Sequence, residues 1–194
     1  VTLTAFAAAN SNYNAIITSV LITINSSTPT LSLSPTLAAN SLTVDYTATI
    51  TASSSPSISI TQQSISYTVS AVVGGGSATV NSATGQISAT GAGAITFTAT
   101  ALANTNYNQA VTSTLIVIGA STPVLIITSA NTMVVDGTLT ATVTTTASQS
   151  IGTLSYSIIN NTGSGIVDAN TGIITAFSAG AITLTVTSLG NSNY

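Results

Sequence analysis

The sequence lacks lysine, arginine, histidine, glutamate, cysteine and tryptophan, and its only charged side chains are three aspartates among 194 residues. General acid–base catalysis, activated nucleophiles and zinc sites all depend on side chains that are missing here. We therefore expect no enzyme activity and no cofactor. Phosphate recognition depends on Lys and Arg, so nucleic acid is also excluded as a partner.

Long apolar runs are missing as well. Ser, Thr or Asn interrupts every apolar stretch, so no segment approaches the ~18 consecutive apolar residues that a membrane-spanning helix requires. The hydrophobic fraction is nevertheless 44%, and the mean hydropathy is +0.60. This composition is unlike that of a disordered coil. We expect a folded protein that does not insert into a membrane.

Threonine and serine make up about a third of the chain, and their placement indicates strands. Apolar residues alternate with threonines over 95–100 and again over 182–187. A period of two is typical of half-buried strands, which β-branched residues also favour. With frequent turn signals and no helical apolar stripe, the pattern predicts an all-β fold built from Greek-key β-sandwiches.

The sequence repeats with a period of about 90 residues. The segment "VTLTAFAAANSNY" at 1–13 returns as "ITFTATALANTNY" at 95–107 and as "ITLTVTSLGNSNY" at 182–194. Proline-marked segments at 26–29 and 120–123 are expected to be linkers. The predicted domains are therefore residues 1–25, the C-terminal strands of a preceding repeat; residues 26–119, a complete repeat; and residues 120–194, a repeat lacking its last strand.

These boundaries are compatible with two arrangements of the chain. In the first, the sequence is an excerpt from a longer array. In the second, strand donation, residues 14–24 of one copy fill the place left after Tyr194 in the next copy.

One turn recurs in both larger units. Gly85 and Gly172 each follow an Asn- or Asp-started turn, at a position that needs positive φ. Asn81 and Asp168, which start these turns, are expected to cap backbone N–H groups. Calcium is the alternative, but it wants about six to eight oxygen ligands. A lone Asp168 does not supply them, so no metal site is predicted.

Two further sets of residues are candidates for structural roles. Tyr13, Tyr107 and Tyr194 occupy one fixed place per unit, as expected of a corner tyrosine that bonds the backbone. The alternative is a stacking platform for carbohydrate. The terminal strand of each unit is apolar on both faces, which predicts packing against the next repeat, its linker or a neighbouring chain. The candidate residues for that packing are Ile22, Ile24, Ile116 and Ile118.

The stretches "ATVNSATGQISATGAGAITFTATA" at 78–101 and "GIVDANTGIITAFSAGAITLTVTS" at 165–188 resemble the core signature of bacterial immunoglobulin-like (group 2-like) domains. The resemblance implies tandem sandwiches on extracellular surface proteins such as adhesins, where most copies form a stalk. Several members of that family carry calcium-binding acidic residues, which have no match here.

We therefore expect a structural stalk or shaft repeat of an extracellular bacterial fibre or giant surface adhesin. Its expected partners are neighbouring repeats of the same or identical chains. One alternative is a subunit of a self-assembling extracellular filament, joined by strand donation or lateral packing. Another is an adhesin repeat that binds a glycan or a surface, although no tryptophan, charge cluster or long loop marks such a site.

Overall fold

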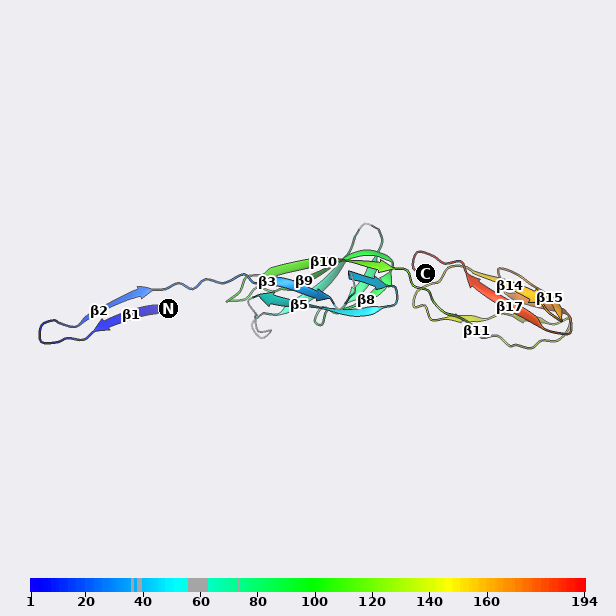
Figure 1. Ribbon diagram of the computed structural model, residues 1–194, viewed down its shortest axis with the longest axis horizontal. Helices are drawn as coiled ribbons and strands as arrows, with labels where there is room; N and C mark the ends of the chain where they lie inside the picture. The colour runs from blue at the N-terminus through cyan, green and yellow to red at the C-terminus, as the bar shows by residue number, and fades with distance from the viewer. Residues whose placement is uncertain (36, 38–39, 56–62, 73) are drawn as a thin grey trace.

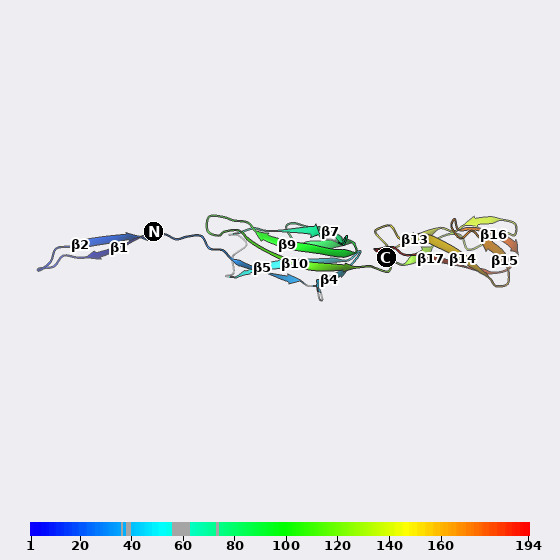
Figure 2. The same cartoon turned by 90° about the horizontal axis from the view of Figure 1, so that it is seen from above.

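The computed structural model describes residues 1–35, 37, 40–55, 63–72 and 74–194. Seventeen strands occur in this part of the chain, and the predicted all-β fold class is confirmed. The strands form a hairpin, a sandwich and a second group of sheets, which follow one another along a single long axis (Figure 1, Figure 2). We call these three bodies the hairpin, the middle unit and the third unit.

The hairpin consists of β1 (Thr2–Ala7) and β2 (Ile16–Leu21), which pair in antiparallel register from Thr2 with Leu21 to Ala7 with Ile16. Every residue of both strands is exposed. The same pairing, Ala101 with Ala110, joins the corresponding strands of the middle unit. The hairpin therefore reproduces two strands of a sandwich without the opposing sheet.

The middle unit is a sandwich of two four-stranded sheets. β9 (Gly93–Ala101) is an inner strand of one sheet, and from Ile95 onward its buried apolar residues alternate with half-buried threonines. It pairs on one edge with β6 (Ile65–Ala71) and on the other with β10 (Ala110–Gly119), both antiparallel. The first sheet has the order β4 (Ser41–Thr43), β10 (Ala110–Gly119), β9 (Gly93–Ala101), β6 (Ile65–Ala71); the second has β3 (Thr30–Pro35), β5 (Thr47–Ser55), β8 (Gln86–Gly91), β7 (Ser77–Val80).

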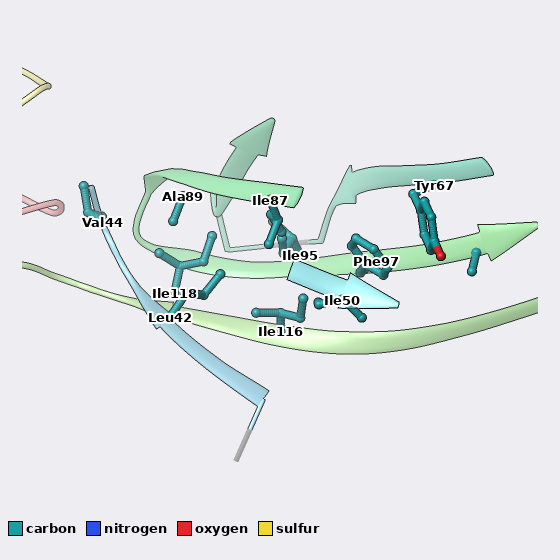
Figure 3. Close-up of a cluster of buried hydrophobic side chains, with 11 residues drawn as sticks. Leu42, Val44, Ile50, Tyr67, Ile87, Ala89, Ile95, Phe97, Ile116 and Ile118 are labelled. Carbon is teal, nitrogen blue, oxygen red and sulfur yellow. The ribbon is translucent and has the colours of Figure 1, made fainter. Parts of the chain in front are cut away.

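The core of the middle unit lies between these sheets (Figure 3). Phe97 on β9 is fully buried, and its ring lies 5.6 Å from that of Tyr67 at an angle of 35°. The Tyr67 hydroxyl accepts a hydrogen bond of 3.1 Å from the Ala52 backbone N–H of the opposite sheet. This tyrosine therefore fastens the two layers to each other.

The predicted packing role of Ile116 and Ile118 is wrong. Both side chains are at most 2% exposed and belong to the core of their own sandwich, so they are not available to another repeat. The other face of β10 is the exposed one, and it carries Val111, Leu115 and Val117. A strand with apolar residues on both faces does not reveal from its sequence which face is buried.

The third unit has the same plan, but its sheets are less complete. β17 pairs with β14 as β9 pairs with β6, and no described strand lies on the other edge of β17. Residues 132–134, which correspond to β4, are outside any strand, because β4 forms by pairing with β10. The strands are β11 (Leu125–Ile127), β12 (Thr138–Thr140), β13 (Val143–Thr145), β14 (Leu154–Asn160), β15 (Ser164–Val167), β16 (Ile173–Ser178) and β17 (Ile182–Ser188).

Candidate functional site: a joint between repeats

A loop of sequence Asn-x-Asn-Tyr recurs three times with one geometry. In residues 191–194, the Asn191 Oδ1 accepts hydrogen bonds from the backbone N–H groups of Asn193 (2.8 Å) and Tyr194 (3.1 Å). The Asn191 N–H in turn donates to the Tyr194 carbonyl at 2.8 Å. Residues 10–13 and 104–107 make the same three bonds. An asparagine side chain that replaces a backbone acceptor fixes such a loop locally.

The loop is also attached to the linker that precedes its unit. The Ser121 N–H donates to the Asn193 carbonyl at 2.9 Å, and the Ser27 N–H donates to the Asn106 carbonyl at 3.0 Å. These pairs occupy equivalent positions in the third and middle units. Linker and loop therefore form one pole of each unit, the pole that follows the preceding repeat.

The opposite pole of the middle unit carries a turn at Asp45. This residue has φ of 71°, a left-handed conformation that Asp and Asn adopt more readily than most residues. Its N–H donates to the Ala89 carbonyl at 3.1 Å, and the Ala89 N–H donates to the Tyr46 carbonyl at 3.0 Å. The turn holds the Asp45 carboxylate at the end of the sandwich.

The two poles meet between the middle and third units. The Tyr194 hydroxyl donates to Asp45 Oδ2 at 2.8 Å and accepts from the Gln149 N–H at 3.1 Å. The Ser148 hydroxyl donates to Asp45 Oδ1, and the Ser148 N–H to Oδ2 at 3.3 Å. Tyr194 also packs against the core cluster of the middle unit. We call this set of contacts the Asp45–Tyr194 joint.

A backbone contact lies beside this joint. The Ala92 N–H, between β8 and β9, donates to the Asn193 Oδ1 at 2.9 Å. Asn193 thus contacts the middle unit through its side chain and its own linker through its carbonyl. Both asparagines of the loop therefore have a structural role, one inside the loop and one across the joint.

Three donors from the third unit lower the pKa of Asp45. The Ser148 hydroxyl has the largest effect, the Tyr194 hydroxyl and the Ser148 N–H add to it, and a small loss of solvation opposes them. The chain contains no lysine, arginine or histidine to neutralise this carboxylate, so hydroxyl and amide donors stabilise its charge. The joint is therefore strongest when Asp45 is ionised.

The sequence patterns do not reveal this site. Asp45 was not among the predicted site residues, whereas the structure gives its carboxylate three donors from the following unit. The contact joins residues 149 positions apart, which spacing does not reveal. One signal was present: Asp45 and Asp136 are two of only three charges, and they occupy equivalent places in successive repeats.

Lowering the pH is expected to loosen the Asp45–Tyr194 joint before it unfolds either unit. Because the folded pKa of Asp45 is depressed, its stabilising contribution is present above the ordinary aspartate pKa of about 3.9 and is lost below it. The carboxylate is exposed, so the free energy involved is small. Spin labels on the two units should give an unchanged distance distribution from pH 7 to about 4 and a broader one below.

Asp45→Asn is the matched variant for this titration. Asparagine keeps the left-handed turn but removes the ionisable group. Its distance distribution should be broad already at neutral pH and should not change with acid. A wild-type distribution that stays narrow well below the pKa of every aspartate would contradict the assignment.

The predicted turn residues lie away from the joint, at two equivalent turns. Asn81 Oδ1 accepts from the N–H groups of Ala83 (3.0 Å) and Thr84 (3.1 Å), and Gly85 follows with φ of 72°. Asp168 Oδ1 accepts from Asn170 and Thr171, each at 2.9 Å, and Gly172 follows with φ of 70°. The N–H groups of Thr171 and Asn170 lower the pKa of Asp168.

The three predicted tyrosines lie at the same place in their units but in different surroundings. Tyr13 is 75% exposed at the tip of the hairpin. Tyr107 is half-buried and bridges to Ser27 of the linker. Tyr194 alone meets another repeat, and its hydroxyl contacts both a backbone N–H of its own unit and Asp45 of the middle unit.

The described residues include no cluster of three or more His, Cys, Asp or Glu that would hold a metal ion. Within the same residues, no helix has the length and apolar character needed to cross a bilayer.

Comparison with known proteins gives structural neighbours but no family. No protein-family model and no curated protein matches the chain. Among solved structures, it is similar to mouse cadherin-23 EC22-24 (17% identity, TM-score 0.34, 97% of this chain and 68% of that one) and to Drosophila N-cadherin EC1-4 (13%, 0.37, 97% and 55%). Human CDH23 EC21-23 has 16% identity and a TM-score of 0.31, and the match covers 86% of this chain and 59% of that one.

The last two neighbours are longer than this chain, which spans between half and two thirds of their length. At these TM-scores the likeness carries no functional argument. The assignment of the fold rests on the strand order and registers of this chain.

Proposed function

We propose that this chain is a structural shaft repeat of an extracellular bacterial fibre or giant surface adhesin, without catalytic activity. The observation that carries the proposal is the Asp45–Tyr194 joint, which connects the end of one sandwich to the beginning of the next. Only residues 120–124 connect β10 of the middle unit to β11 of the third unit, so the linker is short. Repeats joined in this way give an array whose length increases with the number of copies.

The composition supports the same role. With three aspartates, no basic residue and about a third of its residues threonine or serine, the chain offers no charge cluster for a specific ligand. The turn motif shared by 78–101 and 165–188 resembles that of bacterial immunoglobulin-like domains, whose tandem copies mostly form stalks. We therefore place the chain in the extracellular space, with neighbouring repeats as its partners.

A second candidate, a self-assembling filament joined by strand donation, is favoured by a groove beside β17. The groove has a volume of about 550 Å³, and Gly180, Ile182 and Leu184 of the β17 segment line it. The corresponding positions in the middle unit are Gly93 and Ile95. There β10 covers them, pairing Ile118 with Gly93 and Ile116 with Ile95. The groove therefore lies beside the strand whose counterpart in the middle unit is covered by β10.

The hairpin carries such a strand. Residues 14–24 correspond to 108–118, which places Ile22 and Ile24 at the positions of two core residues of β10. They are 43% and 76% exposed. Docking on β17 of a second copy would bury them, and β17 would replace β1 as the partner of β2. The exchange is favourable because a two-stranded hairpin without a core is marginally stable.

The mass of the native polypeptide distinguishes the two candidates. In native extracellular material, an antibody raised against this chain should detect a polypeptide far above 19.1 kDa if the repeats belong to one long array. A denatured subunit of about that mass, recovered from a larger native assembly, would instead refute the long array and favour strand donation. Detection only inside cells would refute both.

A further inference from the structure

The chain carries a second turn with the geometry of the Asp45 turn. Asp136 has φ of 61°, and its N–H donates to the Ala176 carbonyl at 2.9 Å. The Ala176 N–H donates to the Gly137 carbonyl at 3.2 Å, as Ala89 does to Tyr46 in the middle unit. Among the described residues, none donates a hydrogen bond to the Asp136 carboxylate. The third unit therefore presents an acceptor like that of Asp45 at its far pole.

The chain also carries a second tyrosine pole with the geometry of the Tyr194 loop. The loop at 104–107 has the same internal bonds, and Asn106 is bonded to the linker through Ser27 as Asn193 is through Ser121. A hollow of about 290 Å³ opens at this pole, lined by the linker and by Asn106 and Tyr107. No described residue bonds to the Tyr107 hydroxyl.

We propose that these two poles are the halves of further joints: Asp136 accepts a hydrogen bond from the tyrosine of an Asn-x-Asn-Tyr loop on the next immunoglobulin-like repeat, and Tyr107 donates one to the aspartate turn of the preceding repeat. The partner is in both cases a repeat of this sequence class. The inference rests on the proposed function, because it requires an array of repeats, and it identifies the contact by which the array is held straight.

The third unit also has an equivalent of the Ala92 backbone contact that lies beside the Asp45–Tyr194 joint. Ala179 follows β16 at the position that Ala92 occupies after β8. In the Asp45–Tyr194 joint, the Ala92 N–H donates to Asn193. The Ala179 N–H is accordingly the donor for the second asparagine of the next loop. The loop equivalent to that of Ser148 includes residues outside the described part, so the inference depends on the tyrosine and asparagine alone.

The test is a tandem of the full chain followed directly by residues 14–194 of a second copy. Asn14 corresponds to Asn108, which follows Tyr107, so this fusion continues the repeat in register. It places Asp136 of the first copy before Tyr107 of the second. The chain has no cysteine, so spin labels at Ser157→Cys of the first copy and Thr68→Cys of the second are the only labels.

Both label sites are exposed and occupy equivalent places on β14 and β6. Thr68→Cys and Ser157→Cys within a single chain therefore calibrate the measurement across the Asp45–Tyr194 joint. The inter-spin distance distribution across the new joint should be as narrow as in that calibration. Asp136→Asn or Tyr107→Phe should broaden it roughly twofold or more, because a small interface permits domain motion by default.

Asp168→Asn is the matched control, since Asp168 lies in a turn within its unit and away from the joint. It should leave the distribution unchanged. A broad distribution in the unsubstituted tandem, or a narrow one insensitive to both joint substitutions, would overturn the inference. These results would not affect the proposed shaft function, which is tested separately by the mass of the native polypeptide.

Discussion

Replacing Ile116 by alanine is expected to destabilise the middle unit by about 2–5 kcal/mol, the range found when a large aliphatic side chain is removed from a packed core. Ile116 is fully buried in β10 and belongs to the core cluster with Ile95 and Phe97. Three missing carbons leave a cavity that the rigid sandwich fills only in part. Urea unfolding followed by circular dichroism would measure the free energy of unfolding.

Leu115→Ala is the matched control, because Leu115 is the neighbouring residue on the same strand and is 52% exposed on the opposite face. It should cost about 0.5 kcal/mol or less, as expected for a surface substitution. Equal losses for the two variants would mean that both faces of β10 are buried. A larger loss for Leu115 would mean that the core lies on the other face.

The contrast between these neighbours shows where sequence reasoning succeeded and where it failed. In β9 the inward residues are apolar and the outward residues are threonines, so the two-residue period alone identified the buried face. In β10 both faces carry Ile, Leu or Val, and the period identifies a strand without saying which face is buried. That assignment depends on the side on which the second sheet lies.

The Asp45–Tyr194 joint was beyond sequence reasoning for a different reason. Its internal parts were readable, because an Asn-x-Asn-Tyr loop and a turn with a lone aspartate are local features. Their meeting depends on the linker, the length of the sandwich and the rotation of one unit relative to the next. The residues that form the contact determine none of these three properties. Repetition of the two parts in register was the only available signal.

The charges of Asp45 and Asp168 are stabilised in the same physical way. In a chain without lysine or arginine, an ionised carboxylate is stabilised only by hydrogen-bond donors. Asp168 obtains backbone N–H groups within its own turn, whereas Asp45 obtains hydroxyl and amide donors from the next unit. Because the donors to the Asp45 carboxylate belong to the next unit, the contact between the two repeats depends on the charge of Asp45. This is why the joint, and not the sandwich, is expected to respond to acid.

Replacing Gly85 by alanine is expected to destabilise the middle unit by about 2–5 kcal/mol, through two costs that add. Gly85 has φ of 72°, and a left-handed alanine costs about 1–2 kcal/mol. Its new Cβ would also overlap the carbonyl oxygen of Ile50, which belongs to the backbone of β5 and not to a flexible side chain, and overpacking of this kind costs about 1–3 kcal/mol. Gly75→Ala separates the two costs, because Gly75 has φ of 86° but open space around its Cβ. It should show only the conformational cost, and equal losses in urea unfolding would refute the steric part of the explanation.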